Sequence, residues 1–465
     1  MTITPSDLLH RPGPAYRALA DALADQIGAG RLTPDERLPP QRDLAFRLAV
    51  TVGTVGRAYD LLAQRGLVRG EVGRGTFVLG RAEPMAQVRD VAGVSDGLID
   101  LTSNFPAPVD AQARLGDLLP TAESAVDLLA ELLRYPEVAG SLRHRASAAS
   151  WLGQLGLTAE PDRVVLTNGA EGALAAALLA LARPGDAILA ESLCYSGLRN
   201  LASRLGQHLE PVAMDEQGII PDALSAAARH RGARVLVLSP NLHNPTVILM
   251  PAERRAAIAD VARELDLLLV EDDVYGPLVA DRPPALATLA PERTLYLSSV
   301  SKFLAPGLRL GFVSGPGNLV REVTAAQREL SLGHAPLAAE LFARASRAGV
   351  VAEALQQQRR EMGERQRLAR DLLVDLETAS QPTALHVWLS LPARWSSAEA
   401  ALALARTGVL VAPAERFFIG RGMAPRALRV SLSAPPTTTH LRGALERIAR
   451  VLAPDAGTSE TGSLV

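Results

Sequence analysis

From Leu98 onward the chain alternates short apolar runs with longer helical stretches, and this alternation restricts the folds open to it. The apolar runs have the length and aliphatic content of buried strands, and they lie at residues 163–167, 187–190, 235–238, 267–270 and 294–297. Helical patterns, such as those at 171–182 and 251–265, separate them. Such alternation predicts an α/β domain with a mostly parallel central sheet that helices cover on both faces. Ligands of these sheets bind at the carboxyl ends of the strands.

Length and composition indicate a globular protein with more than one domain. The chain has 465 residues, of which 48% are hydrophobic and 21% charged, which is enough for two or three cores. Cys194 is the single cysteine, so no disulfide can form within the chain, and a reducing cytoplasm is the expected location. No apolar run has membrane-spanning length, so we expect no membrane contact. The net charge of -2 argues against general coating of nucleic acid but allows a local DNA-binding face.

The first eighty residues have a different pattern from the rest. Apolar residues recur at helical spacing over 16–28, 40–48 and 52–66, and residues 67–78 predict two short strands around a Gly-Arg-Gly tip. Three helices followed by a β-hairpin are typical of a winged helix-turn-helix, an α+β unit whose third helix enters the major groove of DNA. A helical protein-interaction module is the alternative. We therefore expect a DNA-binding domain at 1–80, a linker at 81–98, the α/β domain at 99–455 and a loose polar tail at 456–465.

Lys302 is the single lysine of a chain with 48 Lys and Arg residues. Arginine serves well in ion pairs and phosphate contacts, but its guanidinium cannot form a Schiff base with an aldehyde, whereas a lysine amine can. One interpretation is a leftover lysine on a solvated loop, and the other is an amine kept for covalent chemistry. Ser299, Ser301 and Arg309 flank Lys302, and hydroxyls with a guanidinium beside an amine suit a phosphate-bearing aldehyde.

Three further polar groups follow predicted strands. Residues 167–171 run from a strand through a glycine turn into a helix, whose free amides suit a phosphate. Asn244 precedes a proline after the 235–238 strand, which by itself is ordinary turn chemistry. An acidic triplet follows the 267–270 strand, and it consists of Glu271, Asp272 and Asp273. A metal site is conceivable there, but neither a histidine nor a further acidic cluster follows nearby, so we expect no metal. A single carboxylate at this place could instead pair with a protonated ring nitrogen.

Residues 30–78 resemble the GntR family of bacterial transcription regulators. The stretch GRLTPDERLPPQRDLAFRLAVTVGTVGRAYDLLAQRGLVRGEVGRGTFV carries the Arg-Leu-Pro, Ala-Tyr-x-x-Leu and Gly-x-Gly-Thr-Phe-Val elements of the family in order. By this resemblance, the side chains that would face phosphates or base edges are Arg42, Thr51, Thr54 and Arg57, with Arg74 at the wing tip near the minor groove. The chain departs from the family at Val52, where members commonly carry arginine. Valine can pack on a thymine methyl but makes no bidentate contact to guanine, so an unusual operator preference is expected.

Residues 98–450 resemble the class I aminotransferases, which are pyridoxal 5'-phosphate enzymes of fold type I. The resemblance rests on the strand-end residues described above, taken in order, and it implies that Lys302 holds the cofactor as an internal aldimine. Asp272 would face the pyridine nitrogen and keep it protonated, which makes the ring an electron sink. Arg429 would receive the α-carboxylate of an amino-acid ligand through its bidentate fork. Family members usually have glycine after Asn-Pro-Thr, where this chain has Val247.

The same resemblance assigns the remaining cofactor contacts. Tyr275 and Asn244 would hydrogen-bond the ring hydroxyl, and Tyr195 would stack on the ring. The phosphate would be bound by Gly169, Ala170, Glu171, Ser299, Ser301 and Arg309, and Tyr135 would reach the phosphate of a partner subunit. Cys194, next to Tyr195, is expected to be a small buried residue rather than a nucleophile.

A GntR winged helix fused to an aminotransferase-like domain is the layout of the MocR-type regulators, and the whole chain resembles one. The resemblance implies a bacterial, cytoplasmic protein that binds a double-stranded DNA operator as a head-to-tail homodimer, associated with the nucleoid when bound. Its large domain would sense an amine, an amino acid or pyridoxal 5'-phosphate through Lys302. Two alternatives stay open: a working aminotransferase with an accessory DNA-binding domain, and a degenerate domain kept for dimerisation.

Overall fold

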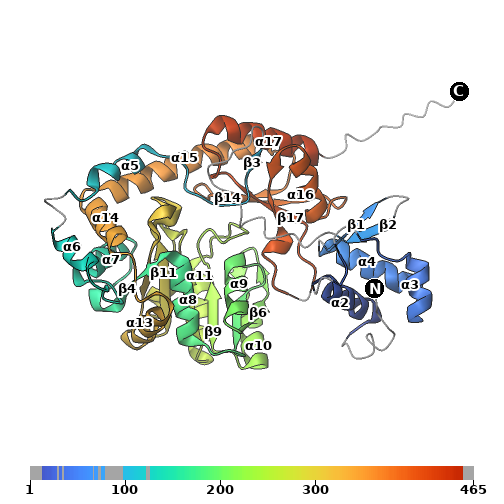
Figure 1. The fold of residues 1–465 in the computed structure, drawn as a ribbon, viewed down its shortest axis with the longest axis horizontal. Helices are drawn as coiled ribbons and strands as arrows, with labels where there is room; N and C mark the ends of the chain where they lie inside the picture. Colours follow the sequence, from blue (N-terminus) through green and yellow to red (C-terminus); the bar gives the residue numbers. More distant parts are fainter. Residues whose placement is uncertain are drawn as a thin grey trace.

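A computed structural model of the chain describes residues 13–28, 31–33, 36–65, 67–71, 75–78, 98–121, 126–420 and 422–453. These residues form a small N-terminal unit and a large α/β unit (Figure 1). The wing-tip residue Arg74, the expected linker apart from Leu98, and the expected tail lie outside the described residues. Among the described residues, no helix is both long and apolar enough to span a bilayer.

The N-terminal unit contains the three helices and the hairpin that the sequence predicts. They are α2 (Ala15–Gly28), α3 (Gln41–Leu48), α4 (Val52–Gln64), β1 (Val68–Glu71) and β2 (Gly75–Val78). The two strands pair antiparallel, with Val68 opposite Val78. Leu19 of α2 packs with Val55 and Leu62 of α4 in one apolar core, which accounts for the helical spacing of these residues. The fold is the predicted winged helix-turn-helix.

The turn between α3 and α4 is fixed by backbone geometry and by a cap. Ala49 ends α3 in the left-handed region with a φ of 52°. Thr51 caps α4, because its hydroxyl accepts a hydrogen bond from the main-chain N–H of Thr54 at 3.1 Å. The two threonine hydroxyls also lie 2.9 Å apart. The first turn of α4 is therefore held firmly while its outer side remains exposed.

A seven-stranded sheet forms the middle of the large unit (Figure 1), with the strand order β4-β12-β11-β10-β9-β5-β6. β12 pairs antiparallel with both of its neighbours and the other pairs are parallel, so the expected mostly parallel sheet is confirmed. The strands are β4 (Val164–Asn168), β5 (Ala187–Glu191), β6 (His208–Val212), β9 (Val235–Leu238), β10 (Leu268–Asp272), β11 (Thr294–Ser299) and β12 (Leu310–Ser314). Every run predicted to be a strand forms one.

Apart from the edge strand β6, alternate residues along the strands enter different apolar cores, which explains why these strands are mostly apolar. In β9, Val235 and Val237 pack in the core of one face, whereas Leu236 and Leu238 pack in the core of the other. The first face is covered by α8 (Gly169–Leu181), α9 (Ser196–Arg204) and α13 (Gly317–Ser331). The second face is covered by α10 (Pro221–Arg231), α11 (Ala252–Glu264) and α12 (Leu286–Leu289).

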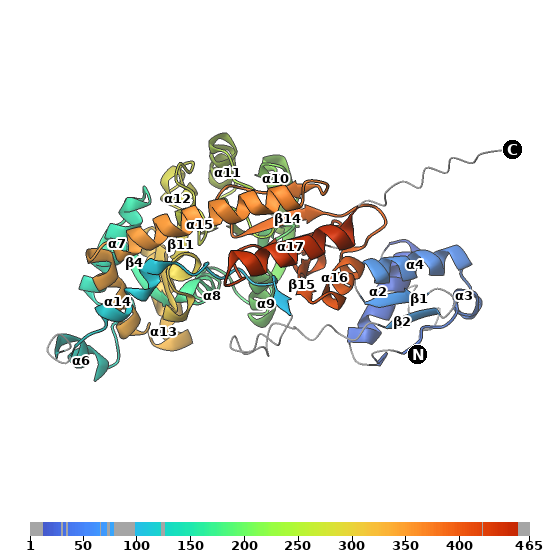
Figure 2. The same ribbon diagram turned by 90° about the horizontal axis from the view of Figure 1, so that it is seen from above.

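The C-terminal part adds a smaller antiparallel sheet and two long helices. The sheet consists of β13 (Thr378–Ala379), β14 (His386–Ser390), β17 (Ala427–Ser431) and β16 (Ala412–Pro413), in that order. α15 (Val350–Leu372) and α17 (Thr438–Leu452) run side by side (Figure 2). β3 (Ile99–Asp100) pairs parallel with β15 (Val409–Leu410), so the start of the large unit lies beside its C-terminal part. The remaining α-helices and β-strands are α5 (Asp110–Ala113), α6 (Val126–Leu132), α7 (Leu142–Gln154), β7 (Met214–Asp215), β8 (Gly218–Ile219), α14 (Pro336–Arg347) and α16 (Ser397–Arg406).

Candidate functional site

A cavity of about 140 Å³ lies at the carboxyl ends of the central strands, where the sequence predicts a ligand site. The parallel strands all end at this edge, and β12 begins there because it runs in the opposite direction. That reversal brings Arg309, which directly precedes β12, close to the residues that follow β4 and β11. The predicted cofactor-binding residues that line the cavity are Ala170, Glu171, Tyr195, Asn244, Asp272, Tyr275, Ser299, Ser301, Lys302 and Arg309.

Lys302 ends the 3-10 turn η5 (Val300–Lys302), which continues directly from β11. The residue is half-buried, and its Nζ donates a hydrogen bond to the main-chain oxygen of Asn104 at 2.9 Å. Nζ also lies 5.6 Å from the centre of the Tyr275 ring. A leftover lysine on a solvated loop does not fit this position, because the amine is held in the wall of a cavity by a rigid strand end.

The three consecutive acidic residues lie at the end of β10, and two of them, Glu271 and Asp273, are held by hydrogen bonds from protein donors. Glu271 is buried and accepts hydrogen bonds from the main-chain N–H groups of Leu286 and Ala287, at 3.1 and 2.9 Å, where α12 begins. Burial and the neighbouring Asp273 carboxylate raise the pKa of Glu271 to about 7.

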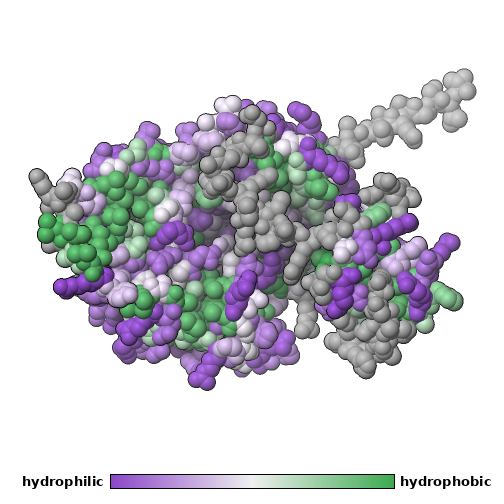
Figure 3. Space-filling model, in the orientation of Figure 1, coloured by the Kyte–Doolittle hydropathy of each residue, from purple (hydrophilic) through white to green (hydrophobic). Residues whose placement is uncertain are grey.

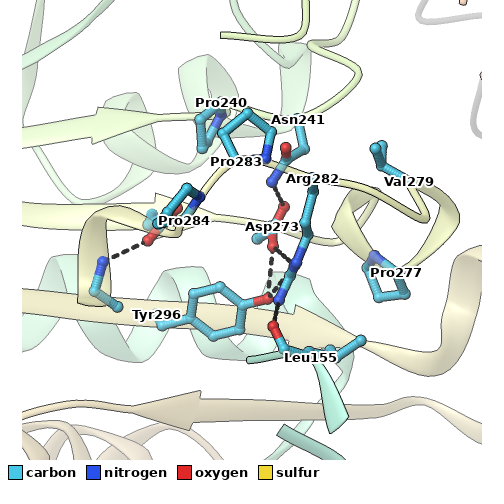
Figure 4. A network of polar contacts seen from close by, with 12 residues as sticks. Leu155, Pro240, Asn241, Asp273, Pro277, Val279, Arg282, Pro283, Pro284 and Tyr296 are labelled. Atoms are coloured by element: carbon cyan, nitrogen blue, oxygen red, sulfur yellow. Dashed lines mark hydrogen bonds and ion pairs between the residues drawn. The ribbon is translucent and has the colours of Figure 1, made fainter. Parts of the chain in front are cut away.

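Asp273 is the centre of a buried polar network (Figure 4). Its carboxylate accepts hydrogen bonds from the Tyr296 hydroxyl at 2.6 Å and from Asn241 Nδ2 at 2.7 Å, and it forms an ion pair with Arg282 at 2.5 Å. Arg282 also donates to the main-chain oxygen of Leu155. The network therefore ties the end of β10 to β11, to the loop after β9 and to the residue that follows α7.

Asp272 differs from both neighbours, because its Oδ1 is buried and has no hydrogen-bond partner among the described residues. Burial, together with the Asp273 and Glu171 carboxylates, raises the pKa of Asp272 to about 7. Since Asp272 lines the cavity, its unpaired oxygen is placed to accept a hydrogen bond from a protonated ring nitrogen. In the part of the chain that the structure describes, no group of three or more His, Cys, Asp or Glu residues is arranged to hold a metal ion.

The two side chains assigned to the ring hydroxyl are each held by a polar partner. The Tyr275 hydroxyl accepts a hydrogen bond from Asn104 Nδ2 at 3.1 Å, and Asn244 Oδ1 accepts one from Arg429 Nη1 at 2.8 Å. Arg429 lies on β17, is 6% exposed and also donates to the main-chain oxygen of Thr102. Its Nε has no partner among the described residues, and burial lowers the pKa of Arg429 to about 10. A guanidinium buried this deeply is well placed to bind a carboxylate.

Tyr195 is fixed against the start of α8. It directly precedes α9, and its hydroxyl donates a hydrogen bond to the Glu171 carboxylate. Burial and the negative charge of Glu171 raise the pKa of the Tyr195 hydroxyl, so the ring stays neutral. The contact requires glycine at 197, because a Cβ there would lie 2.3 Å from the Tyr195 ring. Cys194 is buried, as expected of a small core residue, and burial raises the pKa of its thiol to about 12.

The groups expected to bind a phosphate surround the N-terminus of α8. Gly169 has a φ of 75°, and a Cβ there would lie 2.7 Å from Arg309 Nη2, so only glycine lets the guanidinium approach. The Ser299 hydroxyl donates to the main-chain oxygen of Leu310 at 2.9 Å and lies 2.8 Å from the Ser301 hydroxyl. A helix N-terminus beside two hydroxyls and a guanidinium suits a phosphate.

The other predicted site residues lie away from this cavity. Tyr135 is 86% exposed and follows α6. Arg42 on α3 and Arg57 on α4 are exposed, as is Thr51. Thr54 is half-buried and contributes to the cap of α4.

Comparisons with known proteins match both units. Residues 97–448 match the family model of class I and II aminotransferases, and residues 15–78 match that of the bacterial regulatory proteins of the gntR family. The chain is 32% identical over 451 residues to the HTH-type transcriptional regulator YdeF of Bacillus subtilis, with 94% of each chain covered. The chain belongs to the MocR-type group of GntR regulators.

Two further relatives are also transcription regulators, and a solved aminotransferase structure resembles the large unit. This MocR-type chain is 31% identical to the vitamin B6 salvage pathway transcriptional repressor PtsJ of Salmonella typhimurium over 307 residues. The alignment covers 65% of this chain and 68% of PtsJ. The chain is 29% identical over 375 residues to the HTH-type pyridoxine biosynthesis transcriptional regulator PdxR of Corynebacterium glutamicum, with 79% and 80% covered. The α-aminoadipate aminotransferase LysN of Thermus thermophilus, solved with N-(5'-phosphopyridoxyl)-L-leucine, aligns with a TM-score of 0.67 at 26% identity, over 79% of this chain and 95% of LysN.

The site of this MocR-type chain fits pyridoxal 5'-phosphate, the cofactor of class I aminotransferases. Lys302, with its amine, and Asp272, with its unpaired carboxylate oxygen, line one cavity. A cradle for a phosphate lies beside them at the start of α8. The amine, the carboxylate and the phosphate cradle therefore match three groups of the cofactor, which are its aldehyde, its ring nitrogen and its phosphate.

Sequence reasoning missed the residues that support the site from the N-terminal end of the large unit and from the small sheet. They are Thr102, Asn104 and His386. Asn104 and His386 are 282 positions apart, so no local spacing could connect them. Asn104 lies in a short polar break after β3, which is too common a pattern to single out.

Proposed function

We propose that this protein is a pyridoxal-phosphate-dependent transcription regulator whose large unit senses an amine or amino acid, or the cofactor itself. The observation that carries the proposal is a cavity lined by Lys302, Asp272 and Tyr275, in a chain that also contains a winged helix. The names of the relatives PtsJ and PdxR refer to vitamin B6 salvage and pyridoxine biosynthesis, which supports keeping the cofactor among the candidate effectors.

The residues around the cavity divide the chemical tasks. Pyridoxal phosphate, when bound, supplies an aldehyde that reacts reversibly with amines and a ring that withdraws electrons. Lys302 provides the resident amine, and Asp272 holds the proton of the ring nitrogen. Arg429 takes the carboxylate of an amino-acid ligand, and this contact selects amino acids over simple amines.

Sensing requires that the effector binds two arrangements of the protein with different affinity. The Lys302 amine that binds the cofactor would give up its hydrogen bond to the main-chain oxygen of Asn104, and a ligand amine that displaces Lys302 would allow this bond to form again. A carboxylate at Arg429 would compete for the guanidinium that holds Thr102 and Asn244. Both contacts reach residues 102–104, just after β3 and a few positions after Leu98, where the described part of the large unit begins. An effector therefore acts close to the N-terminal end of the large unit.

The winged helix binds a double-stranded DNA operator through α3 and α4. Arg42 and Arg57 are exposed and reach phosphates or base edges. The Thr51 hydroxyl already caps α4, and the Thr54 hydroxyl is hydrogen-bonded to it. Val52 begins α4 with 44% of its surface exposed, which favours contact with thymine methyl groups. DNA binding places the protein in the cytoplasm, on the nucleoid when it is bound.

A head-to-tail homodimer is the expected assembly, and exposed apolar residues support it. They gather on and around α6, where Figure 3 shows a hydrophobic area at one end of the molecule. The residues are Leu119, Val126, Leu129, Leu132, Leu133 and Leu142, each at least 48% exposed. Apolar side chains clustered in this way are typical of an interface. Tyr135 lies next to them, as a residue that acts on a partner subunit must.

The proposal is tested with the full chain in two steps: selection of the DNA that it binds, and electrophoretic mobility-shift titration of that DNA. Genomic fragments that the protein retains are sequenced to find an operator, which is then titrated with and without pyridoxal phosphate and single amino acids. Wild-type affinity should change by about tenfold or more with one of these ligands, which corresponds to about 1.4 kcal/mol of coupling. Lys302→Arg keeps the charge but not the amine chemistry, so it should bind the operator without responding. A normal ligand response in Lys302→Arg would overturn the proposal.

Aminotransferase activity is the second candidate, because the catalytic set and Arg429 are present together. Amino-acid donors and oxo-acid acceptors are supplied together, and the oxo acid formed is followed over time. Turnover at ordinary enzymatic rates, about 1 s⁻¹ or faster, would favour the enzyme. Half-reactions that take hours would favour the sensor.

A further inference from the structure

Behind Tyr275 lies a buried chain of hydrogen bonds that crosses from the small sheet to the cavity. His386, the first residue of β14, is fully buried, and its Nε2 lies 3.0 Å from the main-chain oxygen of Pro245. Its Nδ1 lies 2.9 Å from Asn104 Nδ2, and the same amide nitrogen lies 3.1 Å from the Tyr275 hydroxyl. The chain of contacts thus begins at a carbonyl oxygen and ends at a group that lines the cavity.

The carbonyl of Pro245 determines which ring nitrogen of His386 carries the proton. A carbonyl oxygen can only accept a hydrogen bond, so Nε2 must be the N–H group. Burial, with the nearby Arg429 cation and the His243 ring, lowers the pKa of His386 well below its usual value. The imidazole is therefore neutral, and its Nδ1 is an acceptor.

An acceptor at Nδ1 in turn determines the orientation of the Asn104 side-chain amide. The NH₂ end must face Nδ1, since the amide oxygen at that place would set two acceptors against each other. Asn104 Oδ1 is buried without a hydrogen-bond partner in the described part of the chain, which is a cost that this orientation imposes. The second hydrogen of the same NH₂ group points to the Tyr275 oxygen.

We propose that His386 is a positioning residue that directs the hydroxyl hydrogen of Tyr275 into the cavity. Because the Tyr275 oxygen accepts from Asn104 on its inner side, its own hydrogen is left for a group inside the cavity. The inference rests on the proposed function, since that group is the hydroxyl oxygen attached to the ring of pyridoxal phosphate. A fixed donor stabilises this oxygen as an anion, and so lowers the pKa at which the chromophore at Lys302 titrates.

The experiment measures that pKa from the visible absorption of the full chain loaded with pyridoxal phosphate. His386→Leu removes the acceptor for Asn104, and the chromophore pKa should rise by about one unit, because a hydrogen bond to a charged oxygen is lost. His386→Asn keeps a hydrogen-bond acceptor near the position of Nδ1, so its chromophore pKa should lie at least halfway back from the His386→Leu value to the wild-type value. In a Tyr275→Phe background, His386→Leu should add no further shift.

His334 supplies a matched control for the loss of a buried imidazole. It is 6% exposed, and neither ring nitrogen has a hydrogen-bond partner among the described residues. His334→Leu should leave the chromophore pKa unchanged. An unchanged pKa in cofactor-loaded His386→Leu, or an equal shift in His334→Leu, would overturn the inference.

A second measurement needs neither a variant nor the cofactor. Proton–nitrogen correlation spectra of the ¹⁵N-histidine-labelled wild-type chain report which ring nitrogen of His386 carries the hydrogen. We expect the neutral form with hydrogen on Nε2 at pH 7, and hydrogen on Nδ1 or a charged ring would overturn the inference. Absence of any visible band in the loaded wild-type protein would instead refute the proposed function, so the two failures are distinguishable.

Discussion

Asp272 shows, at the scale of one residue, how a site can reduce the stability of the protein that contains it. Its pKa is raised to about 7, whereas the same carboxyl in an unfolded chain titrates at about 3.8. The folded chain therefore binds this proton more tightly than the unfolded chain. The contribution of Asp272 to the free energy of unfolding is most favourable below pH 4 and is lost as pH rises to about 7. Glu271 shifts in the same direction and adds to the effect.

Asp272→Asn should raise the free energy of unfolding of the cofactor-free chain at pH 8 by about 2 kcal/mol, because it removes a buried unpaired charge. The gain should shrink towards pH 4, and cofactor affinity should fall. Urea unfolding at pH 5 and pH 8 measures the stability. Asp273→Asn is the matched control and should destabilise the chain, because it weakens the ion pair with Arg282. A variant Asp272→Asn no more stable than wild type at pH 8 would contradict this account.

At the scale of residues, the sequence predicts the site residues that lie at strand ends, but it misses the residues that hold these side chains in place. Lys302, Asp272 and Tyr275 follow apolar runs that can be read locally, whereas His386 reaches Tyr275 only because the small sheet folds over the cavity. Val247 shows a second limit. It has a φ of 57° where the family usually has glycine, so the turn is kept with a strained β-branched residue.

At the scale of elements, a buried ion pair joins the sheet to its surroundings. The Asp273 side chain is 0% exposed and that of Arg282 10%, and the pair lies directly beside the carboxylate that faces the cavity. Arg282→Met would leave Asp273 buried and unpaired. We expect a loss of about 3–5 kcal/mol in the free energy of unfolding, measured by urea unfolding at pH 7.

The double variant Asp273→Asn with Arg282→Met tests whether that loss comes from the unpaired charge. It should recover a large part of the stability, because no buried charge is then left without a partner. A loss of less than about 1 kcal/mol in Arg282→Met would show that the pair is not desolvated as the structure indicates.

Five of the seven strands of the central sheet could be predicted because their residues are mostly apolar on both faces, whereas β6, which contains His208 and Glu210, and β12 were not predicted. β9 was located residue for residue, since Val235 to Leu238 is bounded by polar positions. The antiparallel direction of β12 and the small sheet were beyond local patterns. Strand order depends on which distant segments pack together, as when β12 pairs with both β11 and β4.

At the scale of the whole molecule, the apolar residues around α6 predict an interface. Leu133 is 77% exposed, and Leu133→Glu should weaken dimerisation by about tenfold or more, because a charge would be buried in the apolar contact. Val374 is 76% exposed on the loop after α15, and Val374→Glu serves as the control that should remain dimeric. Light scattering across a dilution series gives the assembly state. A wild-type monomer, or equal dissociation in both variants, would contradict the assignment of this face.

The central claim is that Lys302 carries the cofactor, and the composition of the chain makes its test unusually direct. Full-length protein is incubated with pyridoxal phosphate, reduced with borohydride, digested and analysed by mass spectrometry. Because Lys302 is the single lysine, the account predicts a phosphopyridoxyl adduct on that residue in wild type, and neither adduct nor visible band in Lys302→Arg. A wild-type protein without the adduct at Lys302, or a Lys302→Arg protein that keeps the visible band, would contradict it.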